Sequence, residues 1–414
     1  MSHFVFIESN TTGTGAIAVE RMLARGDRVT FLTRSREKYP FLADPKPGLE
    51  VAGVETNDVE AIAVFLGDLL GRTGVDVVLT FSDFYVAIVA EVAARFGFRY
   101  LSPAPARTCR SKLLTREALR RAGLPTPDFW RLSSEEEALR LSREVRYPCV
   151  VKPPSDSSSY GVRVVRDAGE LLAQYRALSA ETANVRGQAL DGTVLVESYL
   201  DGPEYSVETV TLPGGPAVVL GVTDKHLSPP PHFVETGHDF PSAADPAVVA
   251  GLAGATTAAL DAVGFDFGPA HTELRWTERG PVVVEINARL AGGMIPELVR
   301  YALGVDLLDT LLDLLLGRPV DLRPTRHETA SVRFLTVDRR GRLAGWQGAE
   351  AARSLPTVRE VFFGKEAGAL VQPAENAYHR LGFVIAAGPD RSLVQADLQR
   401  ALAALHAEVE PSSL

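Results

Sequence analysis

The segment from residue 270 to residue 293 constrains the fold more than any other, because it has the pattern of two β-strands joined by a tight hairpin. It reads AHTELRWTERGPVVVEINARLAGG. A three-residue loop, Glu278–Gly280, with glycine in the left-handed position, is a common connection for such hairpins. Counting back along the ladder from that loop places Glu273 opposite Glu285. The sequence therefore predicts two carboxylates facing each other across antiparallel strands.

Opposed carboxylates repel each other, and a cation bound between them reverses the sign of that interaction. Alternate residues of a strand share a face, so Asn287 and Arg289 are expected beside Glu285. Mg²⁺ typically takes one or two carboxylates together with substrate phosphates. We therefore expect a cation site at Glu273 and Glu285, with Gly292–Gly293 leaving free backbone next to it. A solvated hairpin face is the alternative interpretation.

Composition indicates an ordinary globular enzyme. A chain of 414 residues is long enough for two or three domains, and 46% hydrophobic with 23% charged residues is typical of soluble proteins. The net charge of −9 and the lack of a basic cluster argue against nucleic-acid binding. Two cysteines are too few for a disulfide framework or a thiolate metal site. We see no signal peptide and no apolar run of the ~18 residues that span a bilayer, so we expect a cytoplasmic protein that does not bind membranes.

The first 105 residues alternate strand and helix, which predicts a small parallel sheet covered by helices. Strands are expected at 4–7, 29–32, 77–80 and 99–101, and helices at 15–25, 58–70 and 85–96. Thr12–Gly15 follows the first strand and contains G-x-G. The third glycine of a dinucleotide-binding loop is missing, which argues against nicotinamide binding.

Beyond this region the pattern changes to long strands and hairpins, so the fold class combines α/β with α+β. The linker at 123–127 contains one glycine and two prolines, which cannot continue a helix. The remaining expectations are a helix at 111–122, a loop-like stretch at 227–241, a strand at 330–335 and a terminal helix at 390–407.

A phosphate-binding loop is predicted after the apolar strand that ends in Lys152. The following residues, Ser155–Gly161, offer hydroxyls, free N–H groups and one glycine, and such a loop can fold over phosphates. It is not a Walker A loop, which runs from G-x-x-x-x-G-K into a helix. A solvated strand end is the alternative for Lys152.

A nucleotide-binding bend is predicted after the strand that ends in Glu197. The bend exposes backbone groups that can read the edge of a purine. Glu204 follows seven residues after Glu197 and can accept hydrogen bonds from ribose hydroxyls, as acids do in other nucleotide sites. A two-stranded bend with solvated acids is the alternative.

Taken in order, these segments resemble the ATP-grasp superfamily over nearly the whole chain. The hairpin is most similar to bacterial L-amino acid ligases and related carboxylate–amine ligases. D-alanine ligases differ by a proline-rich segment after the asparagine, whereas biotin carboxylase shares the E-x-N-x-R pattern. The resemblance implies an ATP-grasp fold. It would consist of an N-terminal α/β pre-ATP-grasp domain at 1–105, an ATP-grasp domain at 106–320 with its lid subdomain at about 128–200, and a C-terminal cap region at 321–414.

The resemblance also implies roles for individual residues. The ATP-binding residues would be Lys112, Lys152, Ser157, Ser158, Ser159, Gly161, Glu197, Ser198, Tyr199, Leu200, Glu204 and Lys225. The metal ligands would be Glu273, Glu285 and Asn287. The substrate-binding residues would be Glu235, His238, Arg289, Gly292 and Gly293, with Arg289 and Lys152 acting in catalysis.

The implied reaction is the ATP-dependent joining of a carboxylate to an amine. The carboxylate attacks the γ-phosphate of ATP to give an acyl phosphate and ADP, and an amine then displaces phosphate to form an amide. ATP and Mg²⁺, with Mn²⁺ as a substitute, are the expected cofactors, and amino-acid-like small molecules are the expected substrates. The sequence leaves open whether the protein forms a homodimer. The alternatives are an ATP-grasp carboxylase that uses bicarbonate and a catalytically inactive nucleotide-binding regulator.

Overall fold

The computed structural model describes residues 1–411 except residues 12, 158–159 and 230–233. Its N-terminal part is a parallel sheet of order β3-β2-β1-β4 covered by helices, as expected. The strands are β1 (His3–Ile7), β2 (Arg28–Thr33), β3 (Leu49–Gly53) and β4 (Val77–Leu79). The helices are α1 (Thr14–Ala24), α2 (Val59–Arg72) and α3 (Val86–Phe96), and a short 3₁₀ helix, η3 (Asp83–Tyr85), precedes α3.

Two expectations for this region were wrong. Strand β3 was not predicted, because none of its residues is fully buried and its sequence is not continuously apolar. Residues 99–101 form no strand and lead directly into α4 (Pro103–Arg110). Proline is tolerated in the first turn of a helix, since that turn has no intrahelical use for the missing N–H group. Helix α5 (Lys112–Arg121) follows at once, with Ser111 as its N-cap.

An eight-stranded antiparallel sheet forms the centre of the molecule, in the order β13-β12-β9-β10-β11-β14-β18-β16. Its strands are β9 (Glu204–Thr211), β10 (Ala217–Leu227), β11 (Glu235–Phe240), β12 (Gly268–Thr277), β13 (Gly280–Asn287), β14 (Thr329–Leu335), β16 (Val358–Phe363) and β18 (Gly382–Gly388). Strand β11 corrects the expectation of a loop-like stretch at 227–241, because it pairs with β10 and β14 on its two sides.

Helices cover this sheet, and one of them is notably apolar. Helix α8 (Pro246–Val263) is the one helix in the described residues that is long and apolar enough, by length and composition, to cross a membrane. It packs against β10, β12 and β13, as the cover of a sheet does. Helices α9 (Ile295–Leu303) and α10 (Leu307–Leu315) continue from the hairpin and contribute to the largest hydrophobic core.

The β12–β13 hairpin has the predicted register, although its predicted loop was wrong. Thr277 pairs with Gly280, so the connection has two residues and not three. The register then shifts by one residue at a β-bulge, and beyond it Glu273 lies opposite Glu285. The bulge compensates for the shorter loop, and the opposed pair of carboxylates is confirmed.

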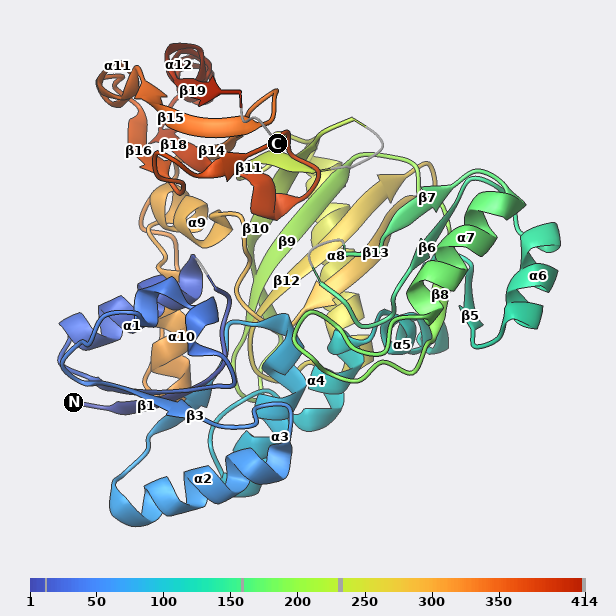
Figure 1. Cartoon of the computed structure of the whole chain (residues 1–414), viewed down its shortest axis with the longest axis horizontal. Coiled ribbons are helices and arrows are strands. Elements are labelled where there is room, and N and C mark those ends of the chain that lie inside the picture. The colour runs from blue at the N-terminus through green and yellow to red at the C-terminus, as the bar shows by residue number, and fades with distance from the viewer. Residues whose placement is uncertain (12, 158–159, 230–233, 412–414) are drawn as a thin grey trace.

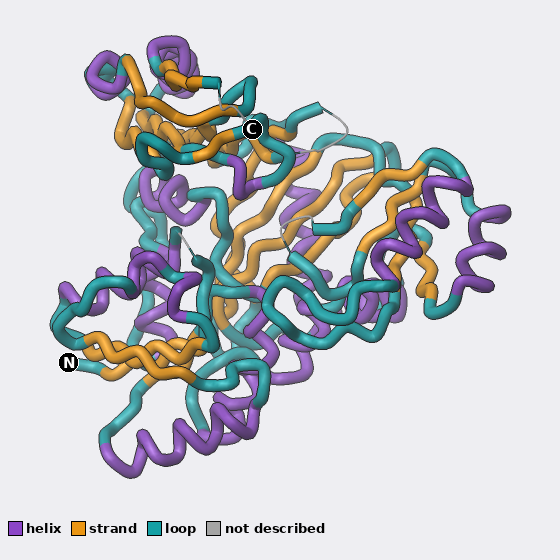
Figure 2. The backbone as a smooth tube through the Cα atoms, in the orientation of Figure 1, coloured by secondary structure: helices purple, strands orange, loops and turns teal. Residues whose placement is uncertain are grey.

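A second antiparallel sheet, of order β5-β8-β6-β7, lies at the right of Figure 1, in the segment that was predicted to be the lid subdomain. Its strands are β5 (Phe129–Leu132), β6 (Cys149–Lys152), β7 (Arg163–Val165) and β8 (Val194–Ser198). Its helices α6 (Glu135–Glu144) and α7 (Ala168–Ser179) pack against each other beside this sheet (Figure 2) and share a separate hydrophobic core with it.

The C-terminal region lies next to α9, away from the lid subdomain (Figure 1). It adds three strands to the central sheet and forms a small sheet of its own, β17 (Leu370–Val371), β15 (Gly341–Gln347) and β19 (His406–Glu410). Helix α12 (Arg391–Ala404) ends earlier than the predicted residue 407, because the chain enters β19. The central sheet contains strands from both sides of the boundary expected at residue 320, and the domain boundaries stay a prediction.

Candidate active site

The first part of the site lies where α5 meets the hairpin and the lid sheet. Lys112, at the start of α5, extends its Nζ to 2.8 Å from Glu285 Oε1 and donates to the carbonyl of Asp156 at 2.8 Å. Lys112 is largely buried, whereas the Glu285 side chain keeps about a fifth of its surface exposed. One carboxylate of the opposed pair is therefore neutralised by a lysine from another element.

One turn after Lys112, Arg116 is fully buried and pairs with Glu197 at the end of β8. Its Nε lies 2.8 Å from Glu197 Oε1, and Lys152 Nζ lies 2.7 Å from the other carboxylate oxygen. Burial raises the pKa of Glu197, but the two cations outweigh it and lower that pKa to about 2. Burial, together with the charges of Arg116 and Lys112, outweighs the effect of Glu197 and lowers the pKa of Lys152 to about 8.

The bulge in the hairpin also serves this cluster. Arg116 donates a hydrogen bond of 2.7 Å to the carbonyl of Val284, the residue at the register shift. A bulge takes a residue out of the ladder and leaves its backbone groups available to other partners. The β-bulge that sets Glu273 opposite Glu285 therefore also gives Arg116 a backbone acceptor.

The second part of the site is centred on Lys225 of β10. Its Nζ lies 2.7 Å from Glu204, 3.1 Å from Glu235 and 3.1 Å from Glu273, and its side chain is 2% exposed. Burial alone lowers the pKa of Lys225, but the surrounding carboxylates, Glu273 first, raise it well above its usual value. The site therefore holds a permanently charged ammonium among three acids.

Each of these acids has a second cationic partner. Arg275 lies 3.2 Å from Glu204, and Arg380 lies 3.0 Å from Glu235. Burial raises the pKa of Glu235 and of Glu273, but Lys225 outweighs it and holds both well below their usual range. Glu235 and Glu273 are consequently ionised.

His271 completes the surroundings of Glu273. Its Nδ1 lies 2.8 Å from Glu208 and its Nε2 lies 3.2 Å from Glu273. Burial lowers the pKa of His271, but the charge and hydrogen bond of Glu208 and the contact with Glu273 raise it to about 9. His271 is therefore an imidazolium near neutral pH.

His238 on β11 is in the opposite state. It is 1% exposed, and neither ring nitrogen has a hydrogen-bond partner among the described residues. Burial lowers its pKa to about 3, although Glu235 lies 3.6 Å away and acts against this shift. A Cβ at Gly293, where φ is 58°, would lie 2.5 Å from His238 Nε2, so this glycine makes room for the ring. The site thus contains a neutral imidazole with both nitrogens available.

Arg289 lies beyond the end of β13 and points toward the N-terminal domain. Its Nη2 is 2.6 Å from Asp83 Oδ2, and its Nη1 donates to the carbonyl of Leu290 at 2.8 Å. Ser157 donates to the same Asp83 oxygen at 3.0 Å. Burial raises the pKa of Asp83, but Arg289 outweighs it and lowers that pKa. Arg289 therefore lies close to Ser157, in the loop that was predicted to bind phosphate.

The predicted nucleotide-binding bend lies at the outer end of this region. Arg275 donates to the carbonyl of Leu200 at 2.8 Å and contacts the hydroxyl of Tyr199 at 3.5 Å. The hydroxyl of Ser198 accepts from the backbone of Asp128 at 3.0 Å. These contacts fix the bend, and they tie it to Glu204 through Arg275.

For the remaining predicted residues the structure gives the following positions. Asn287 is opposite His271 in the ladder and lines a cavity of about 10 Å³ together with Glu285 and Asp83. Gly161 has φ of 67° and its carbonyl accepts from Gln174 at 2.8 Å. Ser158 and Ser159 lie outside the described residues.

The oxygen donors of the hairpin fit a divalent cation by their chemistry. Glu273 and Glu285 oppose each other, Asn287 follows two residues later, and carboxylate and amide oxygens suit Mg²⁺. In the structure each carboxylate is paired with an ammonium group, Glu285 with Lys112 and Glu273 with Lys225. No cluster of three or more His, Cys, Asp or Glu side chains with metal-binding geometry occurs in the part of the chain that is described.

Sequence reasoning missed several residues of this site. His271 and Arg275 flank Glu273 at alternate positions of β12 and pair directly across the ladder with Glu208 and Glu204. Their period of two was a usable signal. Other missed residues are Asp83, Arg116 and Arg380. Of these three, only Arg116 could have been found from the sequence, because it lies one helical turn after Lys112 and so shares its face of the helix.

Comparison with known proteins supports the same architecture. The sequence model of the ATP-grasp domain family matches residues 145–297, and that of the L-amino acid ligase C-terminal domain 2 matches residues 333–410. The Sinorhizobium fredii protein y4rH is 29% identical over 99% of this chain and 86% of its own length. Alanine–anticapsin ligase of Bacillus subtilis is 27% identical over 61% of this chain, and the match spans only 56% of that protein.

Solved structures agree on the fold. The crystal structure of L-amino acid ligase from Bacillus licheniformis superimposes with a TM-score of 0.83, covering 99% of both chains at 23% identity. Biotin carboxylase from Campylobacter jejuni gives a TM-score of 0.74 over 99% of this chain and 92% of its own, at 16% identity. The expected fold is confirmed.

Proposed function

The chain belongs to the ATP-grasp ligases that join carboxylates to amines, and from that premise we propose that it forms an amide bond between amino-acid-like substrates through an acyl phosphate. The observation that carries the proposal is the opposed pair Glu273 and Glu285 with a buried ammonium group on each side. Phosphoryl transfer needs little more than positioning and charge neutralisation, which such a cluster can supply.

In this proposal Lys112 and Lys152 bind the phosphates of ATP, with Ser157–Gly161 covering them. Both lysines are nearly buried, and buried charges act more strongly on a phosphate than exposed ones. Glu197 holds Lys152 in place. Lys225, which has three carboxylate partners, orders Glu204 for the ribose and Glu273 for the metal.

Glu273, Glu285 and Asn287 are the residues that would hold Mg²⁺, whose charge would polarise the phosphates of bound ATP. The two carboxylates are each about a fifth exposed on their side chains, so an ion can reach them. Lys112 and Lys225 would then turn from the carboxylates toward phosphate oxygens. Their long, flexible stems permit this change.

The amino-acid-like substrate is proposed to bind between Arg289 and Glu235. A carboxylate matches the forked donors of Arg289, and an ammonium group matches Glu235, whose pKa is held low by Lys225. His238 and the glycines Gly292 and Gly293 would shape the wall between them. The relation to a ligase named for alanine and anticapsin supports small amino-acid-like substrates.

The proposed chemistry has two steps. A carboxylate oxygen attacks the γ-phosphorus of ATP, and ADP leaves. The amine nitrogen then attacks the acyl carbon, and phosphate leaves as the amide forms. Arg289 is proposed to stabilise the oxyanion of that second step, because a fixed cation aimed at developing charge is effective in a site that excludes water.

The test is a matrix of carboxylates and amines in which ADP, phosphate and product mass are measured together. We expect ADP release only with a matching pair, and a product whose mass equals acid plus amine minus water. ATP alone and ATP with bicarbonate are the controls. Equal ADP release with bicarbonate alone, without any amide product, would replace the ligase by a carboxylase.

The setting of the reaction follows from its substrates. A ligase that consumes ATP and small acids is proposed to act in the cytoplasm. A homodimer is likewise a proposal, and light scattering of the purified protein at several concentrations decides between one and two subunits.

A further inference from the structure

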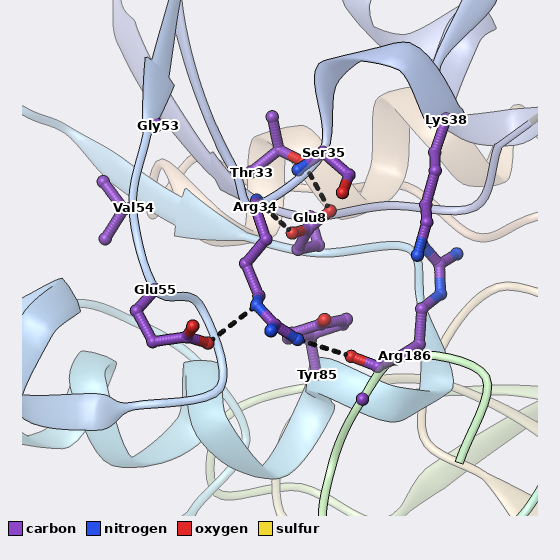
Figure 3. A pocket seen from close by; sticks show the side chains of 11 residues that line it. Glu8, Thr33, Arg34, Ser35, Lys38, Gly53, Val54, Glu55, Tyr85 and Arg186 are labelled. Atoms are coloured by element: carbon purple, nitrogen blue, oxygen red, sulfur yellow. Dashed lines mark hydrogen bonds and ion pairs between the residues drawn. The ribbon is translucent and has the colours of Figure 1, made fainter. Parts of the chain in front are cut away.

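A second cavity, of about 560 Å³, is lined by the N-terminal domain and by Arg186 and Gly187, and it shares no lining residue with the proposed ligase site. Figure 3 shows it at the carboxyl ends of three strands, with Glu8 after β1, Arg34 after β2 and Val54 after β3. Ligands of open parallel sheets bind outside this end of the strands. The volume falls within the ~300–1,000 Å³ of typical small-molecule sites.

Glu8 builds the floor of this cavity. It is 3% exposed and accepts hydrogen bonds from Thr33, from the backbone of Arg34 at 2.9 Å, from Thr56 at 2.7 Å and from the hydroxyl of Tyr39. Its φ of 53° is unusual for a residue with a side chain, and such strain concentrates at functional sites. The carboxylate is fully engaged, so it organises the walls and is not left to bind a cation.

The cations of the cavity are less well compensated. Arg34 pairs with Glu55 at 2.8 Å. Arg186 comes from the segment between α7 and β8. Among the described residues its guanidinium donates only to neutral acceptors, the hydroxyl of Tyr39 and the carbonyl of Ser9, each at 3.0 Å. Lys38 lines the same cavity, and in the described parts of the chain it has no acidic partner.

Three cationic side chains thus line a cavity with two carboxylates, one of which is buried in its own hydrogen bonds. We propose that this cavity is a second binding site, for a small organic anion whose carboxylate or phosphate group is held by Lys38 and Arg186. The hydroxyl-bearing Ser35 on the rim is a further donor. An anion is the ligand that removes the uncompensated positive charge.

The site is separate from the ATP-binding lysines but adjoins the ligase site through η3. Tyr85 of η3 lines the cavity, whereas Asp83, at the other end of the same 3₁₀ helix, pairs with Arg289. The anion can therefore come from two sources. It is either the acidic tail of a ligase substrate that extends past η3 or a separate metabolite.

The test measures the binding of succinate and of inorganic phosphate to the intact protein without ATP, by calorimetry. Lys38→Gln removes one charged donor at an exposed position, and the loss of one charge-assisted contact should weaken binding by about tenfold to a hundredfold. Lys46→Gln is the matched control, because Lys46 is in the same domain and does not line the cavity. Its affinity should equal that of the unmodified protein.

Failure of both probes to bind at concentrations up to tens of millimolar would overturn the proposal. So would equal weakening by Lys38→Gln and Lys46→Gln, which would indicate general attraction to surface charge. Neither readout depends on the ligase reaction, so the proposal stands or falls apart from the proposed function.

A kinetic arm identifies the source of the anion once binding is established. If the KM of acidic substrates rises in Lys38→Gln and that of neutral substrates does not, the cavity takes the substrate's own tail. If KM is unchanged for both while succinate or phosphate still binds, the ligand is a separate metabolite.

Discussion

The guanidinium of Arg289 lies 2.6 Å from the carboxylate of Asp83, a residue 206 positions earlier in the chain. The pair joins the end of the β12–β13 hairpin to the N-terminal domain. Ser157, in the loop that follows β6, contacts the same carboxylate. Asp83 is therefore the point where the N-terminal domain, the hairpin and the lid subdomain meet. A substrate carboxylate at Arg289 would compete with Asp83 for the same donors.

Arg289→Lys should lower amide formation far more than it weakens ATP binding. A lysine keeps the charge but cannot form the two-pronged contact, and the loss of one oxyanion donor typically costs ~10²–10³ in rate. ATP affinity and ligation are measured in the same variant, with Arg279→Lys at the exposed tip of the hairpin as the control. Equal losses of affinity and rate would make Arg289 a nucleotide-binding residue.

Glu285→Gln should abolish ADP formation while the protein remains folded. The substitution removes the charge of one member of the opposed pair and keeps its size. Circular dichroism and thermal unfolding check the fold, and ADP release checks the activity. Glu278→Gln, in the loop of the same hairpin, should behave as the unmodified enzyme. Normal turnover in Glu285→Gln would disprove the metal assignment.

ATP affinity should fall as the pH rises through about 8, the pKa to which burial lowers Lys152. The ammonium form binds phosphate, and above this pH the free protein loses that form. Bound phosphates raise the pKa of Lys152, so binding above pH 8 must take up a proton. Lys152→Arg keeps its charge at every accessible pH and should flatten the profile. An identical slope in both proteins would show that another group titrates.

The free energy of unfolding should carry a pH-dependent contribution from His271. Its pKa is about 9 in the folded protein against 6.5 for an ordinary histidine, so the stabilisation is complete below pH 6.5 and is lost as the pH rises to about 9. Its size is about 3 kcal/mol, since one pKa unit corresponds to ~1.4 kcal/mol. The slope of stability with pH between these values should decrease in His271→Gln and stay unchanged in the exposed control His406→Gln.

The hairpin shows how far the sequence alone can go. Counting residues gave the correct opposition of Glu273 and Glu285 with the wrong loop, because a bulge compensates for the shorter turn. Bulges depend on partners outside the strand, here the contact of Arg116 with Val284, which no local pattern encodes. The opposition of the two carboxylates was thus predictable, whereas the loop length and the bulge that produce it were not.

Other errors came from contacts between distant segments. The stretch 227–241 has the composition of a loop, but residues 235–240 form β11 because they pair with β10 on one side and with β14 on the other. Strand preference is decided by such neighbours more than by the residues themselves. Lys225 was expected to add a contact to ATP, and its three carboxylate partners, which come from three other strands, were not foreseen. Arg380 reaches Glu235 from 145 residues away, and nothing local marks it.

The place of β11 between β10 and β14 limits how this enzyme can be re-engineered or can evolve. If the C-terminal strands β14, β16 and β18 were exchanged for those of a relative, β11 would need the same backbone register from its new neighbour. Otherwise it would become an open edge prone to aggregation. The same exchange would replace Arg380, which pairs with Glu235 in the proposed substrate pocket. Exchanging this region therefore changes the substrate pocket and the strand pairing of β11 at the same time, so a new specificity obtained in this way requires a compatible β14.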